Sequence, residues 1–137
     1  MEAQFYLTDS EFERQFEDCS LNPKLFSHLA HIRLAWIHIK NYGVDAAIEN
    51  VCTQIKKFDT IHDEGTKYHT TITVASVRTV YHFFLKSESN NFQDFITEFP
   101  RLENNFKDLI DAHYGINLIA SEKAKKEYLA PDLLPYD

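Results

Sequence analysis

Two short segments of this 137-residue chain place histidines where their side chains could perform chemistry. Residues 26–36 carry His28 and His31, and residues 67–73 carry His69. Both segments lie inside strongly apolar, helix-like stretches, where an imidazole needs a hydrogen-bond partner, a ligand or a metal. Because histidine can act as a general base near neutral pH or coordinate a transition metal, the two segments form the candidate site.

The spacing of these histidines is compatible with a metal site. His28 and His31 are three residues apart, so on a helix their side chains share one face. If the two helices pack together, His69 could join them. Three imidazoles with an open position resemble a catalytic zinc site, whereas two imidazoles and a carboxylate resemble a non-haem iron site. The carboxylate would come from Glu64 or Asp63, so the expected metal is Zn or Fe.

Two other hypotheses use the same residues. In the leading one, the histidines, assisted by Tyr68 and Arg33, line a pocket that binds a small molecule and could catalyse a reaction on it. In the rival, the chain is a structural or interaction protein that forms a homodimer, and the histidines are internal hydrogen-bond partners. Arg33 would then pair with a buried acid. A pocket requires converging imidazoles, whereas the rival expects dispersed imidazoles bonded to backbone.

The other histidines and the cysteines carry weaker signals. We expect packing or surface roles for the four remaining histidines, namely His38, His62, His82 and His113. Cys19 and Cys52 are far apart, lack CxxC spacing and have no basic neighbour that would activate a thiol. Two reduced thiols in a cytosolic chain are expected, and a single disulfide is the alternative.

Composition narrows the possible partners. The formal net charge of −7 argues against nucleic-acid binding, which normally needs a basic surface. No apolar run reaches the roughly 18 residues of a membrane span, and the first residues do not resemble a signal peptide. We therefore expect a cytoplasmic protein, with a small molecule or a second copy of the chain as its partner.

The pattern of apolar residues predicts the elements that must position the histidines. With only three glycines and four prolines, few connections are expected. The stretch 68–86 contains β-branched residues typical of a strand, but it is too long for one and keeps helical spacing. The sequence predicts an all-α fold over residues 1–137, a single compact bundle of about five to seven helices. Residues 115–137 would form a last helix and an extended strap. Helices are expected near 11–17, 24–42, 45–58, 68–86, 92–99 and 101–114.

The motifs also resemble those of a family. The combination FxHxxHxRLAW, KYHxTIT and PDLxP looks like a family of small, uncharacterised, mostly bacterial proteins. The matching residues are Phe26, His28, His31, 33–36, 67–69, 71–73, 131–133 and Pro135. The likeness covers residue 25 to the end of the chain. It implies a compact all-helical domain and a shared pocket built by His28, His31 and His69, and it implies no particular activity.

Overall fold

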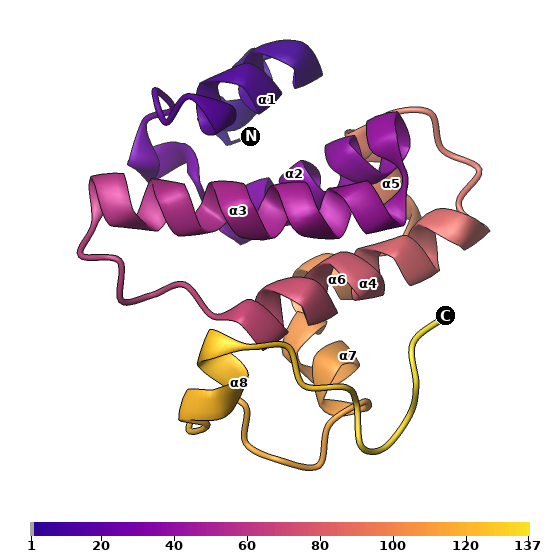
Figure 1. The fold of residues 1–137 in the computed structure, drawn as a ribbon. Coiled ribbons are helices and arrows are strands. Elements are labelled where there is room, and N and C mark those ends of the chain that lie inside the picture. Colours follow the sequence, from indigo (N-terminus) through magenta and orange to yellow (C-terminus); the bar gives the residue numbers. More distant parts are fainter. Residues whose placement is uncertain (1) are drawn as a thin grey trace. The chain divides into compact units, whose positions relative to one another are not determined.

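The architecture is entirely helical in the computed structural model, which describes residues 2–137 (Figure 1). Among these residues there are eight α-helices, two short 3-10 helices and no strand, which confirms the predicted all-α class. None of these helices is long and apolar enough to cross a membrane. The chain divides into two compact units, one ending at Tyr68 and the other beginning at His69, and each is described by itself.

The first unit is built around a long helical hairpin. Helices α2 and α3 lie side by side, and α1 contacts both (Figure 1). Gly43 separates the two long helices with a φ of +85°, a left-handed conformation that glycine adopts without a steric penalty. Its elements are η1 (Ala3–Tyr6), α1 (Asp9–Glu17), η2 (Pro23–Leu25), α2 (His28–Tyr42) and α3 (Val44–His62).

Side-chain caps fix where these helices begin. At α1 the Thr8 hydroxyl accepts from the Glu11 backbone N–H, and the Glu11 carboxylate accepts from the Thr8 N–H, a reciprocal capping box. At α2 the Ser27 hydroxyl accepts from the Ala30 N–H. The predicted helix 24–42 is therefore two elements, because the Ser27 cap begins α2 after the short turn η2.

The core of the first unit is apolar and aromatic. Helix α2 buries an unbroken run from Ile32 to Ile39, as expected for a central helix. Phe16, Phe26 and Phe58 form an aromatic cluster whose ring centroids lie 4.6–5.4 Å apart. This cluster joins α1, the segment before α2, and α3, so it fixes the ends of the hairpin.

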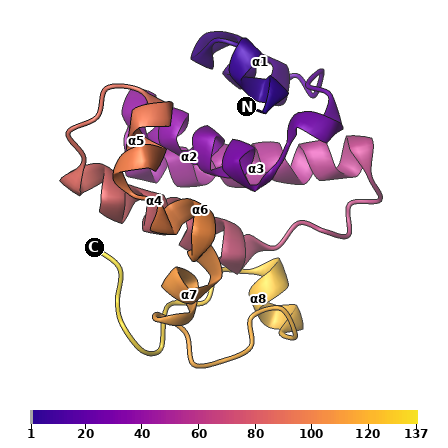
Figure 2. The ribbon, with the colours of Figure 1, turned by 180° about the vertical axis from the view of Figure 1, so that it is seen from behind.

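The second unit places one long helix against several short ones. Helix α4 contacts α7 and α8, which lie along the same side of it in both views (Figure 1 and Figure 2). The predicted helix 101–114 is instead two short helices, because Asn105 leaves the helical conformation between them. Its elements are α4 (Thr70–Lys86), α5 (Phe92–Glu98), α6 (Arg101–Asn104), α7 (Phe106–Asp111) and α8 (Glu122–Lys126).

Helix α4 forms despite a threonine-rich start, as predicted. Thr73 and Thr79 donate their hydroxyls to the carbonyls of His69 and Ala75, four residues earlier, at 2.7 and 2.8 Å. Ser76 does the same with Ile72. These back-bonds satisfy hydroxyls that would otherwise compete for the backbone, so the β-branched residues remain compatible with a helix.

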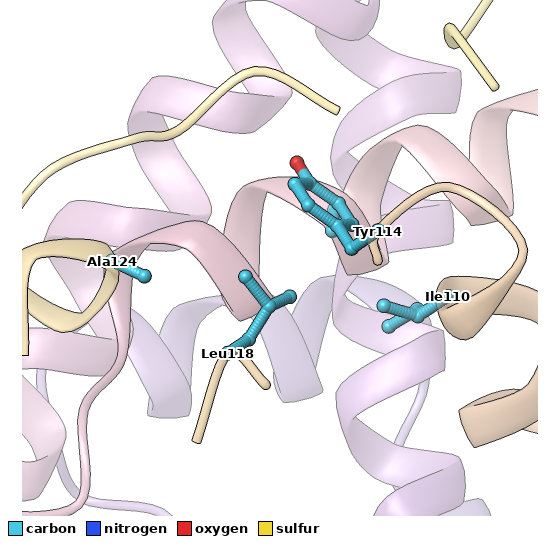
Figure 3. Close-up of a cluster of buried hydrophobic side chains, with 5 residues drawn as sticks. Ile110, Tyr114, Leu118 and Ala124 are labelled. Atoms are coloured by element: carbon cyan, nitrogen blue, oxygen red, sulfur yellow. The ribbon is translucent and has the colours of Figure 1, made fainter. Parts of the chain in front are cut away.

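A buried cluster joins α4 to the C-terminal half of the second unit. Leu118 and Tyr114 lie between Ile110 and Ala124, and the Tyr114 hydroxyl is at the end of the ring away from Ile110 (Figure 3). Ala75 contributes from α4. The cluster anchors the loop after α7 and the short helix α8 to one face of α4.

The strap predicted within residues 115–137 corresponds to residues 127–137, which follow α8 in an extended conformation and are bonded to the same unit. The Thr71 hydroxyl donates to the Glu127 carbonyl and accepts from the Leu129 N–H. Further along, the Leu133 N–H donates to the His113 carbonyl, and the Gly115 N–H donates to Asp132. The strap is therefore held by specific hydrogen bonds along its length.

Candidate functional site

His28 and His31 begin α2 in the first unit, and both side chains are exposed. The His31 ring stacks on Phe26 with centroids 3.6 Å apart, and its Nδ1 donates to the Ser27 carbonyl at 2.8 Å. Loss of hydration against the aromatic cluster lowers the pKa of His31, the Ser27 bond opposes this, and His28 lowers it further, although part of the ring still faces water. The two imidazoles are neighbours, as the spacing predicts.

Arg33 is fully engaged inside the first unit. Its guanidinium is buried and donates to the carbonyls of Gln4 and Leu7 at 2.8 Å and to the Asp9 carboxylate at 2.9 Å. The Phe12 ring lies under it, 4.7 Å from the guanidinium carbon to the ring centroid. Arg33 therefore forms an ion pair, as considered from the sequence, but its acid, Asp9, is 44% exposed rather than buried. The arginine ties the N-terminal segment to α2.

His69 belongs to the second unit and uses both ring nitrogens there. Its Nδ1 accepts from the Ile72 N–H at 3.1 Å, so the imidazole is the N-cap of α4. Its Nε2 lies 2.8 Å from the Leu118 carbonyl and must donate the proton. These two bonds define a neutral imidazole protonated on Nε2. Metal binding through either nitrogen would break one of them.

Tyr68 and Glu64 lie in the segment that follows α3. The Tyr68 hydroxyl hydrogen-bonds to the Cys52 thiol, whose pKa is raised by burial and lowered less by this bond. The Tyr68 and Lys67 backbone N–H groups both donate to one oxygen of the buried Asp59 at 2.9 Å. The Glu64 side chain is exposed.

The other histidines also bond to their own unit. The His62 Nε2 contacts the Cys19 carbonyl at 2.6 Å, and the His113 Nδ1 contacts the Leu134 carbonyl at 2.6 Å. His82 pairs with Asp137 at 2.5 Å. His38 is fully buried beside Asn50, so its packing role agrees with the prediction.

No group of three His, Cys, Asp or Glu side chains within residues 2–137 is placed to bind a metal ion. Cys19 and Cys52 are both free thiols, as expected for reduced cysteines. The structure therefore groups His28 with His31 and gives His69, Tyr68 and Arg33 partners within their own units. The Zn or Fe site and the small-molecule pocket remain predictions.

Comparison with known proteins adds no assignment: no family model, curated protein or solved structure gives a significant match. The likeness to a bacterial protein family, and the shared pocket that it implies, remain predictions for the same reason.

Sequence reasoning missed two polar features of the structure. His38 has a buried Nε2 with no hydrogen-bond partner within residues 2–137. In the second unit, the charge of Arg78 opposes the burial-driven rise in the pKa of two tyrosines, Tyr114 and Tyr136. The helical position of Arg78, one turn before His82, gave a weak signal, but the tyrosines come from segments far along the chain. Their interaction with Arg78 depends on tertiary structure that spacing does not predict.

Proposed function

We propose that this chain is a non-catalytic, cytosolic interaction domain that forms a homodimer, with its histidines serving as internal hydrogen-bond partners. The observation that carries this proposal is the bonding of His69. Both of its ring nitrogens are engaged, one as a helix cap and one with the Leu118 carbonyl. A general base needs a free ring nitrogen facing its substrate, and a metal ligand needs a free lone pair.

The remaining imidazoles support the same interpretation. His31, His62 and His113 each bond to a backbone carbonyl at 2.6–2.8 Å. His31 and His113 also stack on aromatic rings, Phe26 and Tyr136, at centroid distances of 3.6 and 3.8 Å. Such contacts to backbone carbonyls and aromatic rings are a structural use of the imidazole.

The surface for self-association is aliphatic. Ile116, Leu133 and Leu134 are 47%, 61% and 55% exposed. We call these three residues the strap surface. A Cβ added at Gly115 would meet Leu133 Cδ2 at 3.5 Å, so this leucine lies directly over the loop that carries Ile116. The strap is held in this position by two hydrogen bonds, one between the His113 ring and the Leu134 carbonyl and one from the Gly115 N–H to Asp132.

A second copy is the occupant that best fits this surface. Two chains of net charge −7 repel, so their contact must use an uncharged patch. An isologous contact brings the same patch together from both copies, and aliphatic side chains then bury one another without needing complementary charges. Single exposed apolar side chains are common on protein surfaces, whereas a group of exposed aliphatic residues indicates an interaction site.

Light scattering coupled to size exclusion tests the proposal on the full chain. We expect a mass twice that of the monomer for the unmodified protein and a monomer for the double variant Leu133→Asp/Leu134→Asp. Leu85→Asp is the matched control, because Leu85 is 57% exposed at the end of α4, and it should leave the dimer intact. A monomer at all concentrations for the unmodified protein would contradict the proposal.

Elemental analysis separates this proposal from the metal hypothesis. Untagged protein, purified without chelators, should contain no stoichiometric transition metal after incubation with Zn or Fe. Stoichiometric metal that is lost in both His28→Ala and His31→Ala would overturn the structural role of these residues and support a metal centre instead.

A further inference from the structure

The strap is attached to the second unit in two separate blocks. The first block directly follows α8, where the Thr71 hydroxyl donates to the Glu127 carbonyl at 2.8 Å and accepts from the Leu129 N–H at 3.0 Å. The second block consists of residues 132–137, which we call the distal strap. Residues 130–131 join the two blocks and are called the hinge. Each block therefore has its own anchors, and the distal strap can be considered as a separate piece.

His113 is the main anchor of the distal strap. Its carbonyl accepts from the Leu133 N–H at 3.0 Å, and its ring Nδ1 donates to the Leu134 carbonyl at 2.6 Å. The same ring stacks on Tyr136, with the centroids 3.8 Å apart. Two of these three contacts are made to backbone atoms. One residue of the loop after α7 thus fixes both leucines of the strap surface.

The two ends of the distal strap are bonded as well. The Gly115 N–H donates to Asp132 at 2.9 Å, and His82 pairs with Asp137 at 2.5 Å. In contrast, no backbone hydrogen bond within the described chain joins two residues of the distal strap to each other. The conformation of this segment is therefore set by groups elsewhere in the unit. It has no structure of its own to lose when it leaves its site.

The hinge is suited to a change of direction. Neither Ala130 nor Pro131 makes a hydrogen bond with any residue from 2 to 137. Proline fixes its own φ near −65° and biases the preceding residue toward extended conformations, so the hinge does not continue α8. The chain can consequently leave the first block in another direction without breaking a hydrogen bond at the hinge.

We propose that the two copies of the dimer exchange their distal straps, so that residues 132–137 of each copy bind His113, Gly115 and His82 of the other. This inference rests on the proposed homodimer and names how its copies are joined. Exchange retains every contact of the distal strap described above, because the receiving groups are the same in both copies. Its cost is limited to the rearranged hinge and the entropy of association.

Exchange also supplies contact area that the strap surface lacks. Three exposed aliphatic side chains cover far less than the roughly 1,200–2,000 Å² that specific interfaces bury, and two chains of net charge −7 repel. With exchanged straps, Leu133 and Leu134 come from one copy and Ile116 from the other. The strap surface is then built from both chains, and the anchors of two distal straps add to it.

Disulfide trapping in the full chain tests the exchange. A Cβ added at Gly115 would lie 3.0 Å from the Asp132 Oδ2, so Gly115→Cys/Asp132→Cys brings two thiols within bonding reach. After treatment with oxidised glutathione, we expect most of this variant to run at twice the monomer mass in denaturing electrophoresis without reductant. Gly115→Cys alone is the matched control and should run as a monomer. A bond that forms within one copy leaves the double variant at the monomer mass, and the exchange is then wrong.

A second measurement needs no substitution. Carbon-13-labelled and unlabelled chains are unfolded, mixed and refolded, so that mixed dimers form. Because the His113 and Tyr136 rings are in contact, an isotope-filtered nuclear Overhauser effect between the labelled His113 and the unlabelled Tyr136 is expected. A dimer by light scattering that lacks this intermolecular signal overturns the exchange and leaves the homodimer standing. A monomer at all concentrations overturns both proposals.

Discussion

The imidazoles of this chain act mainly as hydrogen-bonding connectors. A neutral imidazole offers one donor and one acceptor, so it can join two backbone groups that no peptide unit would reach. His69 does this by accepting from the Ile72 N–H and donating to the Leu118 carbonyl, 49 residues away in sequence. His38 is the exception, since its buried Nε2 lacks such a partner. Removing a histidine should therefore affect stability before it affects any chemistry.

His38 should make the stability of the first unit depend on pH. Burial lowers the pKa of His38, and Glu13 and Glu17 oppose this less strongly. Since histidine in the unfolded chain titrates near 6.5, the unfolded state takes up a proton first as the pH falls. The contribution of His38 to the free energy of unfolding is thus complete above about pH 6.5. Below that pH it is lost, by at most about 1.4 kcal/mol for each pH unit. Urea unfolding at pH 7.5 and 5.5 measures this loss.

The matched variants are His38→Gln and His28→Gln. The first removes the buried imidazole and should reduce the fall in the free energy of unfolding between the two pH values. His28→Gln changes an exposed imidazole and should leave the fall in the free energy of unfolding unchanged. An unchanged pH dependence in His38→Gln would show that other groups control acid stability.

At the scale of elements, the sequence could predict most of the helices but not the N-cap of α4. Apolar spacing is a local property, so the helical state of 68–86 followed from it even though threonines favour strands. The N-cap of α4 is a histidine rather than the usual Ser, Thr, Asp or Asn, and its second bond depends on Leu118. A partner this distant in sequence has no local signature. The same limit explains why the tyrosines influenced by Arg78 were missed.

Replacing His69 should destabilise the second unit. In His69→Ala the loss of the helix cap costs about 1 kcal/mol, and the loss of the bond to Leu118 costs about 1 kcal/mol more. His69→Asn should recover the cap alone and lose about half as much. Thr70→Ala is the control, because the Thr70 hydroxyl makes only a 3.4 Å contact. Chemical denaturation measures all three. Unchanged stability in His69→Ala would favour a functional role for this imidazole.

At the scale of the whole molecule, the chain passes between its two units at Tyr68 and His69. Asp59 of α3 binds the backbone of the two residues before His69. Both the Lys67 and Tyr68 N–H groups donate to the same oxygen of Asp59, which is only 9% exposed. Residues 61–67 are exposed, although His62 contacts the Cys19 carbonyl and Lys67 pairs with Asp63. We expect the two bonds to Asp59 to be the main restraint on the backbone just before His69.

Asp59→Ala should release the segment and make the bond after Lys67 a preferred site for trypsin. Two hydrogen bonds to a charged acceptor are lost, and each is worth about 1.5–3 kcal/mol, so local opening and the cleavage rate should rise at least tenfold. Mass spectrometry of a limited digest follows this bond against the other lysines. Glu49→Ala, at an exposed acid of the same helix, controls for charge and should leave the rate unchanged. If both variants are cut at the rate of the unmodified chain, the Asp59 contacts do not control this segment, and its conformation must come from the exposed residues themselves.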